Sequence, residues 1–196
     1  MKTVIVGCGR VGATLAEVFD RAGHEVIVVD LVTRAFDRLP SSFNGSAVRG
    51  DGTDEDTLRR AGAEDADIFL ALTEGDNRNV MSAQVAVEEL HARQVIAKIN
   101  DPLRAAAYAD LGLATVCRTT LMTDAITAYL GIPVSGMPGI NPPSGSHHGG
   151  GHHEGNRDGA AASGSMTATG SPAPPVPTPA GAATRDGDGA NGSREG

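Results

Sequence analysis

Three glycines at the spacing Gly7, Gly9 and Gly12 follow directly on a short run of Thr, Val and Ile at residues 3–6. Such a run is typical of a strand that is buried on both faces of a parallel sheet. After the glycines, apolar residues at helical spacing continue to about residue 22. A strand, a glycine-rich turn and a helix in this order place free N–H groups of the helix at the end of the strand. The pattern therefore predicts a phosphate-binding turn.

Each glycine has a separate physical task in such a turn. Gly7 permits the tight turn, Gly9 lets a pyrophosphate approach the backbone, and Gly12 lets the helix pack closely on the strand. Asp30 ends the next apolar run, at 25–29. There a carboxylate can accept both hydroxyls of an adenosine ribose, and its charge would repel a 2′-phosphate. A turn that binds nothing is the alternative, and the register of strand, loop, helix, strand and acid argues against it.

The alternation of strand and helix continues to about residue 130. Further strands are expected at 46–49, 68–72, 95–99 and 114–117, and further helices at about 33–39, 55–61, 77–92, after Pro102 and at 121–130. Strands that alternate with helices predict a parallel sheet covered on both faces. About six strands in this rhythm indicate an α/β fold of the doubly wound Rossmann type.

The composition divides the chain into two unequal parts. All six aromatic residues lie before position 130, and no Leu, Ile, Phe, Tyr or Trp follows Asn141. Residues 136–196 are rich in Gly, Ala, Pro and Ser, and such a segment cannot bury enough apolar surface to offset its chain entropy. We therefore expect one folded domain at 1–135 and a disordered low-complexity tail at 136–196.

Charge and cysteine content narrow the classes of function. The net charge is −8, and the acidic excess already exists in the expected domain, so nucleic acid is not an expected partner. Two cysteines do not make a disulfide framework, and no signal peptide or membrane-spanning window is expected. We expect a cytoplasmic chain. The histidines at 147–153 could hold a transition metal, although a solvated stretch without a role is the favoured interpretation.

Polar residues follow the third, fourth and fifth expected strands. In a doubly wound sheet, ligands lie outside the carboxyl ends of the strands. Asp51 could therefore lie beside an adenine, and Thr73 could donate a hydrogen bond to phosphate or ribose. Lys98 could meet a phosphate, or could have only a packing role. Asp76 and Asn77 are expected to cap the long helix instead.

Two side chains in the glycine turn have open roles, and catalytic groups are sparse. Arg10 could pair with phosphate, contact a partner subunit or be solvated, whereas Cys8 is interpreted as a small filler. His24 and His91 are not placed as general bases, and no tyrosine is followed by a lysine four residues later. We expect no enzymatic activity. A small NAD(P)-dependent oxidoreductase is the alternative, and it rests on the glycine turn alone.

Longer stretches carry a more specific signal than the glycines. They are K-T-V-I-V-G-C-G-R-V-G at 2–12, H-E-V-I-V-V-D at 24–30, V-R-G-D-G-T at 48–53, A-D-I-F-L-A-L-T-E-G-D-N-R-N at 66–79, V-I-A-K-I-N-D-P at 95–102 and L-G-L-A-T-V at 111–116. In this series, which covers about residues 1–130, the chain resembles the TrkA/KTN family. These are nucleotide-binding RCK domains that regulate bacterial potassium uptake and potassium channels.

The resemblance implies a regulatory subunit at the inner face of the cell membrane that performs no chemistry on its nucleotide. It implies NAD(H), ATP or ADP as the ligand and an integral-membrane potassium transporter as the partner, controlled by a ligand-dependent conformational change. It further implies a homodimer, or a heteromer with another RCK subunit, through a crossover helix at 121–130. Packing of that helix within its own subunit is the alternative, and a chain that serves only as a ligand-free dimer partner is another.

The strand-end residues and the resemblance together define a candidate nucleotide site. Its residues are Gly7, Cys8, Gly9, Arg10, Val11, Gly12, Asp30, Leu31, Asp51, Gly52, Thr73 and Lys98.

Overall fold

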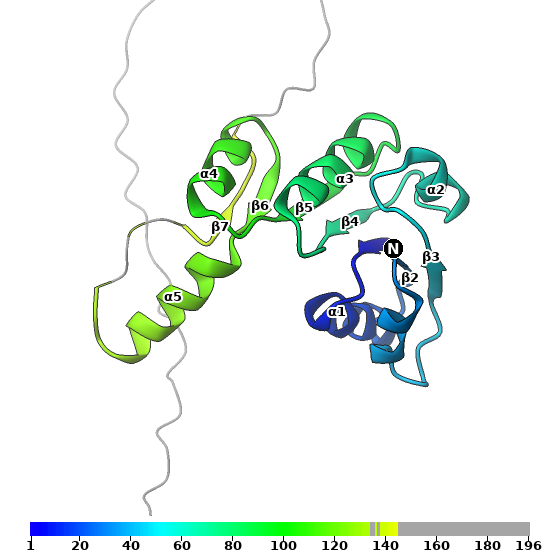
Figure 1. Ribbon diagram of the computed structural model, residues 1–196, viewed down its shortest axis with the longest axis horizontal. Helices are drawn as coiled ribbons and strands as arrows, with labels where there is room; N and C mark the ends of the chain where they lie inside the picture. Colours follow the sequence, from blue (N-terminus) through cyan, green and yellow to red (C-terminus); the bar gives the residue numbers. More distant parts are fainter. Residues whose placement is uncertain (134–135, 137, 145–196) are drawn as a thin grey trace, which may run out of the picture. The chain divides into compact units, whose positions relative to one another are not determined.

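A computed structural model describes residues 1–133, 136 and 138–144. Within this part of the chain, seven strands form one sheet in the order β3-β2-β1-β4-β5-β6-β7 (Figure 1). The strands are β1 (Lys2–Val6), β2 (Glu25–Asp30), β3 (Ser46–Arg49), β4 (Ile68–Ala71), β5 (Gln94–Lys98), β6 (Ala114–Val116) and β7 (Ile140–Asn141). The first six are parallel to one another, which confirms the predicted doubly wound Rossmann sheet.

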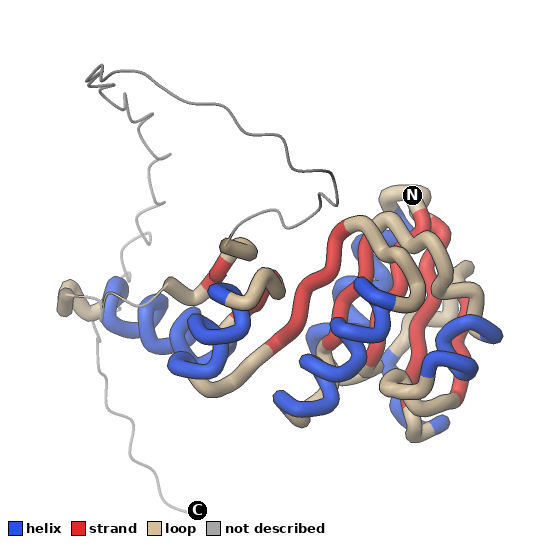
Figure 2. The backbone as a smooth tube through the Cα atoms, turned by 90° about the horizontal axis from the view of Figure 1, so that it is seen from above, coloured by secondary structure: helices blue, strands red, loops and turns tan. Residues whose placement is uncertain are grey.

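Helices flank the strands on both faces (Figure 2). They are α1 (Arg10–Arg21), α2 (Glu55–Arg60), α3 (Asp76–Glu88), α4 (Pro102–Asp110), α5 (Arg118–Tyr129) and a 3₁₀-helix, η1 (Thr33–Arg38). The helices α1 and η1 pack on one face over Ile5, Val28 and Leu70. The helices α2 and α3 pack on the other face, in the cluster that contains Val6 and Phe69. Along the described residues, no helix combines the length and the apolarity that crossing a bilayer requires.

The central strands are buried along their whole apolar length. Val4, Ile5 and Val6 of β1 are 0–2% exposed, and the Val26–Val29 run of β2 is equally hidden. Both faces of these strands carry helices, so the sequence shows continuous apolar runs where a half-exposed strand would alternate. The carboxyl ends of β1 to β4 therefore stand on a rigid base that can hold a site in position.

The carboxyl-terminal edge of the sheet differs from the sequence prediction. After α5 the chain returns as β7, Ile140–Asn141, which pairs antiparallel with β6. The Cys117 N–H donates to the Gly139 carbonyl oxygen at 2.8 Å beside this pair. The sheet thus has seven strands where about six were expected, and the predicted domain boundary at 135 falls before the last of them. The remainder of the expected tail, 145–196 with its histidines, lies outside the described residues.

Candidate functional site

A cleft of about 820 Å³ opens at the carboxyl ends of β1, β2, β3 and β4. The strand order reverses at this place, since β2 and β4 lie on either side of β1. Doubly wound sheets bind ligands at such a reversal, and the volume is that of a small-molecule site. The predicted site residues in the lining are Gly7, Cys8, Gly9, Asp30, Leu31, Asp51, Gly52 and Thr73.

The turn between β1 and α1 is closed by contacts that only glycine permits. Gly7 has a φ of +104°, and a Cβ there would lie 2.9 Å from backbone atoms of Leu72 and Thr73. A Cβ at Gly12 would overlap the Gly7 carbonyl oxygen. The Gly7 N–H donates to the Val29 carbonyl oxygen at 2.8 Å, which ties the turn to β2. The loop and the first turn of α1 are therefore held against the sheet.

The amino end of α1 is open to an anion. Its N-cap is Gly9, no side chain caps it, and its first turn holds no acidic residue. A Cβ at Gly9 would meet no atom within 4 Å, so the backbone is accessible there. The free N–H groups and the helix dipole favour a negative group at this end. This geometry suits a phosphate of the predicted nucleotide.

The Asp30 carboxylate joins the glycine turn to the segment after β2. Its Oδ2 accepts a hydrogen bond from the Cys8 N–H at 2.7 Å, and its Oδ1 accepts one from the Val32 N–H at 2.8 Å. Each oxygen retains a second lone pair. Asp30 is thus locked in place and can still accept two hydroxyl groups, which is what recognition of a ribose requires.

The Cys8 side chain is fully buried under the turn. Burial raises the pKa of the thiol, and the charge of Asp30 raises it further, against an opposing effect of Arg38. Because the thiolate is the reactive form of cysteine, a raised pKa makes Cys8 a poor nucleophile. The Cys8 side chain fills space as the sequence predicts, and its backbone N–H is the group that contributes to the site.

The loop after β3 contributes Asp51 and Gly52 to the cleft. Asp51 Oδ1 accepts hydrogen bonds from the Thr53 N–H at 3.0 Å and from the Thr53 hydroxyl at 2.8 Å. A Cβ at Gly52 would overlap the Val6 side chain, so this loop lies close over the end of β1. Within the described residues Asp51 Oδ2 makes no hydrogen bond to the chain, and it can accept one from a ligand.

A buried asparagine, Asn79, holds Thr73 in the cleft. Asn79 Oδ1 accepts from the Thr73 N–H at 2.8 Å and from its hydroxyl at 2.7 Å. Asn79 Nδ2 donates to the Thr73 carbonyl oxygen at 3.0 Å and to that of Lys98 at 2.7 Å. The Thr73 hydroxyl proton is thus used within the protein, so toward a ligand the hydroxyl offers a lone pair. The prediction that Thr73 donates to a phosphate does not fit this arrangement.

Arginines that the sequence analysis did not select also line the cleft. They are Arg34 and Arg38 on η1 and Arg78 on α3. None of the three makes an ion pair within the part of the chain that the structure describes. Unpaired guanidinium groups beside an open helix terminus complement a phosphorylated ligand. Their sequence signal is weak, because an exposed arginine in a helix is common on any acidic domain.

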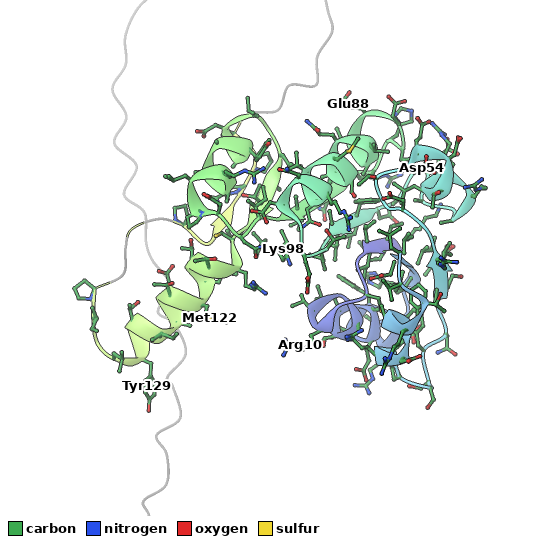
Figure 3. The ribbon with its side chains drawn as sticks, viewed as in Figure 1. Arg10, Asp54, Glu88, Lys98, Met122 and Tyr129 are labelled. Carbon is green, nitrogen blue, oxygen red and sulfur yellow. The ribbon has the colours of Figure 1, made fainter. Side chains whose placement is uncertain are left out.

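Four predicted site residues do not line the cleft. Gly12 packs against Gly7, and Arg10 and Val11 border a shallow hollow on the outer side of α1. Lys98 lies at the end of β5 (Figure 3), where burial lowers the pKa of its ammonium group and the nearby Arg118 lowers it further. These four residues therefore shape the turn or lie beside the cleft, and their side chains do not line it.

The expected capping role of Asp76 and Asn77 is wrong. The N-cap of α3 is Gly75, without a side-chain hydrogen bond, and Asp76 is the first helical residue. The Asp76 carboxylate instead accepts from the N–H and the side-chain amide of Asn100, both at 2.9 Å. Asp76 therefore links α3 to the loop after β5, a tertiary role that overrides the local capping preference.

The two histidines of the described part lie outside the cleft lining. His24 shares a hydrogen bond of 3.1 Å with the Thr3 hydroxyl near the amino ends of the strands. His91 follows α3 with a φ of +53°. Among the described residues, no group of three His, Cys, Asp or Glu side chains is arranged to hold a metal ion.

The helix α5 exposes an apolar surface. Only Thr120 is buried in it, whereas Ile126 is 54% and Tyr129 is 90% exposed. Met122 is also exposed, and Figure 3 marks it with Tyr129 along the helix. A face of this kind indicates an interaction site in an otherwise well-packed domain.

The sequence of this chain is similar to a known domain family and to proteins of potassium uptake systems. The model of the TrkA-N domain matches residues 3–119. The Trk system potassium uptake protein TrkA of Streptomyces coelicolor is 43% identical over 145 residues, which are 74% of this chain and 65% of that protein. The TrkA homolog of Methanothermobacter thermautotrophicus is 32% identical over 58% of this chain and 52% of its own length. The chain thus spans between half and two thirds of these relatives.

Solved structures share the fold. The TrkA-N domain of the inner membrane protein ybaL from Escherichia coli has a TM-score of 0.59 at 19% identity and covers 66% of this chain and 96% of its own. The Kef C-terminal domain of Shewanella denitrificans, in its AMP-bound form, has a TM-score of 0.54 at 20% identity, with coverage of 69% and 85%. The GsuK channel bound to NAD has a TM-score of 0.53 at 21% identity, with coverage of 66% and 23%.

Proposed function

Since the chain belongs to the TrkA-N domain family, we propose that it is a nucleotide-binding regulatory subunit of a membrane potassium uptake system. The observation that carries this proposal is the cleft at the ends of β1 to β4. There the open amino end of α1 suits a phosphate, and Asp30 suits a ribose. The names of the relatives, which are potassium uptake proteins, support the regulatory role.

The proposed ligand is NAD(H) or an adenine nucleotide, ATP or ADP. One structural neighbour binds AMP and another binds NAD, and both ligands contain an adenosine 5′-phosphate. In this chain the phosphate would lie at Gly9, and Arg34, Arg38 and Arg78 supply positive charge along the same cleft. The ribose hydroxyls would donate to Asp30, and the base would extend toward Asp51.

The proposed mechanism is a shift of population between two geometries of an assembled subunit. The nucleotide binds one geometry more tightly and so biases a membrane transporter that contacts the assembly. The apolar face of α5 would contact a second copy of this chain or another RCK subunit, at the cytoplasmic face of the membrane. The bound nucleotide would remain chemically unchanged.

Ligand binding is tested by thermal unfolding of the full chain with NAD, NADH, NADPH, ATP and ADP. A ligand at 100 times its dissociation constant should add about 2.7 kcal/mol to the free energy of unfolding. We expect stabilisation by NAD(H), ATP or ADP and a smaller effect of NADPH, because Asp30 repels a 2′-phosphate. Equal stabilisation by NADPH would mean that the positive charges of Arg34 and Arg38 outweigh the negative charge of Asp30 at the 2′-phosphate. The absence of any shift would leave a ligand-free dimer partner as the better account.

The physiological role is tested by deletion of the gene. Cells without the chain should take up potassium slowly at low external potassium, and re-expression of the wild-type chain should restore the rate. Re-expression of an Asp30→Ala chain should restore it only in part. Normal uptake in the deletion strain would contradict the proposal.

A further inference from the structure

Ser82 lies in the second turn of α3 and lines the cleft although its side chain is fully buried. Its hydroxyl has no hydrogen-bond partner within the described residues. Buried hydroxyl groups in native proteins are nearly always hydrogen-bonded, and a helical serine can use the carbonyl oxygen one turn earlier. Ser82 does not, so a buried hydroxyl of a cleft-lining residue is left without a partner among the described residues. That combination points to a group supplied by a ligand.

The surroundings of Ser82 define one end of the cleft. Arg78 stands one helical turn before it and also lines the cleft, so both lie on the same side of α3. Asp51 and Gly52 line the same cleft, and their loop lies close over Val6 of β1. Val6 gives the cleft apolar surface beneath this loop, and Leu72 adds apolar surface beside the glycine turn. An apolar slot with a few polar edge groups suits a flat heteroaromatic ring.

The polar groups at this end favour one kind of ring. Asp51 Oδ1 already accepts two hydrogen bonds from Thr53, so only Oδ2 is available to a ligand. A single carboxylate oxygen matches a single exocyclic amino group, as in adenine. Guanine would need two free carboxylate oxygens for its neighbouring N–H donors, and its carbonyl oxygen would be repelled by the charge. The Ser82 hydroxyl can then donate to a ring nitrogen of the adenine.

We infer that Ser82 is a base-reading residue, which hydrogen-bonds a ring nitrogen of a 6-aminopurine while Asp51 Oδ2 accepts from the amino group. This inference rests on the proposed nucleotide site and adds the contact that selects the base. It assigns the phosphate, ribose and base to α1, Asp30 and α3 respectively.

Calorimetric titration of the full chain with AMP, inosine monophosphate and ribose 5-phosphate tests the inference. In the wild type, AMP should bind at least tenfold more tightly than inosine monophosphate, which lacks the amino group. Ser82→Ala should weaken AMP about fivefold to tenfold and leave ribose 5-phosphate unchanged. Without ligand, Ser82→Ala should melt at the same temperature or higher, because it removes an unpaired buried hydroxyl and introduces a better helix former.

Thr115→Val is the matched control. Thr115 is also a buried hydroxyl residue, but it lies on β6 and donates to the Ala105 carbonyl oxygen at 2.9 Å, outside the cleft. Its loss should lower the melting temperature and leave AMP affinity unchanged. Equal weakening of AMP and ribose 5-phosphate by Ser82→Ala, or unchanged AMP affinity, would overturn the role of Ser82 while the nucleotide site stands. A wild-type chain that binds none of the three would overturn both.

Discussion

The two ends of the sheet are built differently. Around β1 to β4, strands are buried on both faces, glycines hold the turns, and the buried Asn79 side chain is hydrogen-bonded within the chain. Around β6, α5 and β7, the last strand has two residues and α5 buries only Thr120. The first region can form its site from its own residues. The second presents apolar surface that water disfavours, so it is the region suited to a partner.

The largest expected effect tests the second region. Ile126→Glu places a charge on the apolar face of α5 and should weaken self-association at least a hundredfold, since a symmetric dimer contains the substitution twice. Because Ile126 is 54% exposed, the monomer should remain folded and should bind nucleotide as before. Sedimentation equilibrium gives the association constant.

Leu111→Glu serves as the control for Ile126→Glu. Leu111 is 79% exposed at the end of α4 and does not belong to α5, and its substitution should leave association unchanged. If both variants dissociate equally, or if neither does, α5 is not the contact surface and the proposed difference between the two regions is lost.

The next effect tests the first region. Asp30→Ala removes the acceptor for the Cys8 and Val32 N–H groups and for the proposed ribose, so nucleotide affinity should fall about tenfold to a hundredfold. Association through α5 should not change. Asp37→Ala is the control, because Asp37 also lines the cleft. It removes the same charge and should keep or slightly raise affinity for an anion. A similar loss of nucleotide affinity in both variants would mean that Asp30 acts only through its charge and not through specific hydrogen bonds.

A pair of glycine variants separates folding from binding within the turn. Gly12→Ala should destabilise the chain by about 1–3 kcal/mol, because its Cβ would overlap the Gly7 carbonyl oxygen. Gly9→Ala meets no atom within 4 Å, so it should unfold like the wild type in urea and yet bind nucleotide more weakly. The opposite ranking of the two stabilities would show that the turn is not packed as described.

The smallest expected effect is on the alkylation rates of two cysteines, one from each region. Because burial raises the pKa of the Cys8 thiol above its ordinary value, its thiolate fraction at neutral pH is low, and its alkylation rate should rise as the pH is raised. Nucleotide should slow Cys8 alkylation several-fold, because a bound ligand makes opening of the turn over the buried thiol less frequent. Cys117, just before α5, should respond to association and not to nucleotide. Mass spectrometry of Cys8→Ala and Cys117→Ala chains measures each rate alone, and protection of both cysteines by nucleotide would contradict separate roles for the two regions.

Local signals predicted most of the first region. The apolar runs gave β1, β2 and β4, and the glycine spacing gave the turn, because both patterns reflect constraints within a few residues. Asn79 and Ser82 escaped prediction, since polar residues in a helical pattern normally indicate its solvated face. Only the packing of α3 on β4 and β5 turns them inward. Asp76 was misassigned for a related reason, because Asn100, which is distant in sequence, is a better partner than the helix end.

The amino-acid order by itself determined the doubly wound sheet, the glycine turn and the position of Asp30, because these follow from side-chain periodicity and backbone sterics at short range. The tertiary structure alone decided which polar groups meet in the cleft. It joined Thr73 to Asn79, brought Arg34, Arg78 and Ser82 to the lining, and returned β7 to the edge of β6. Contacts of this kind depend on how strands and helices distant in sequence pack against one another, and the local pattern of residues does not contain that information.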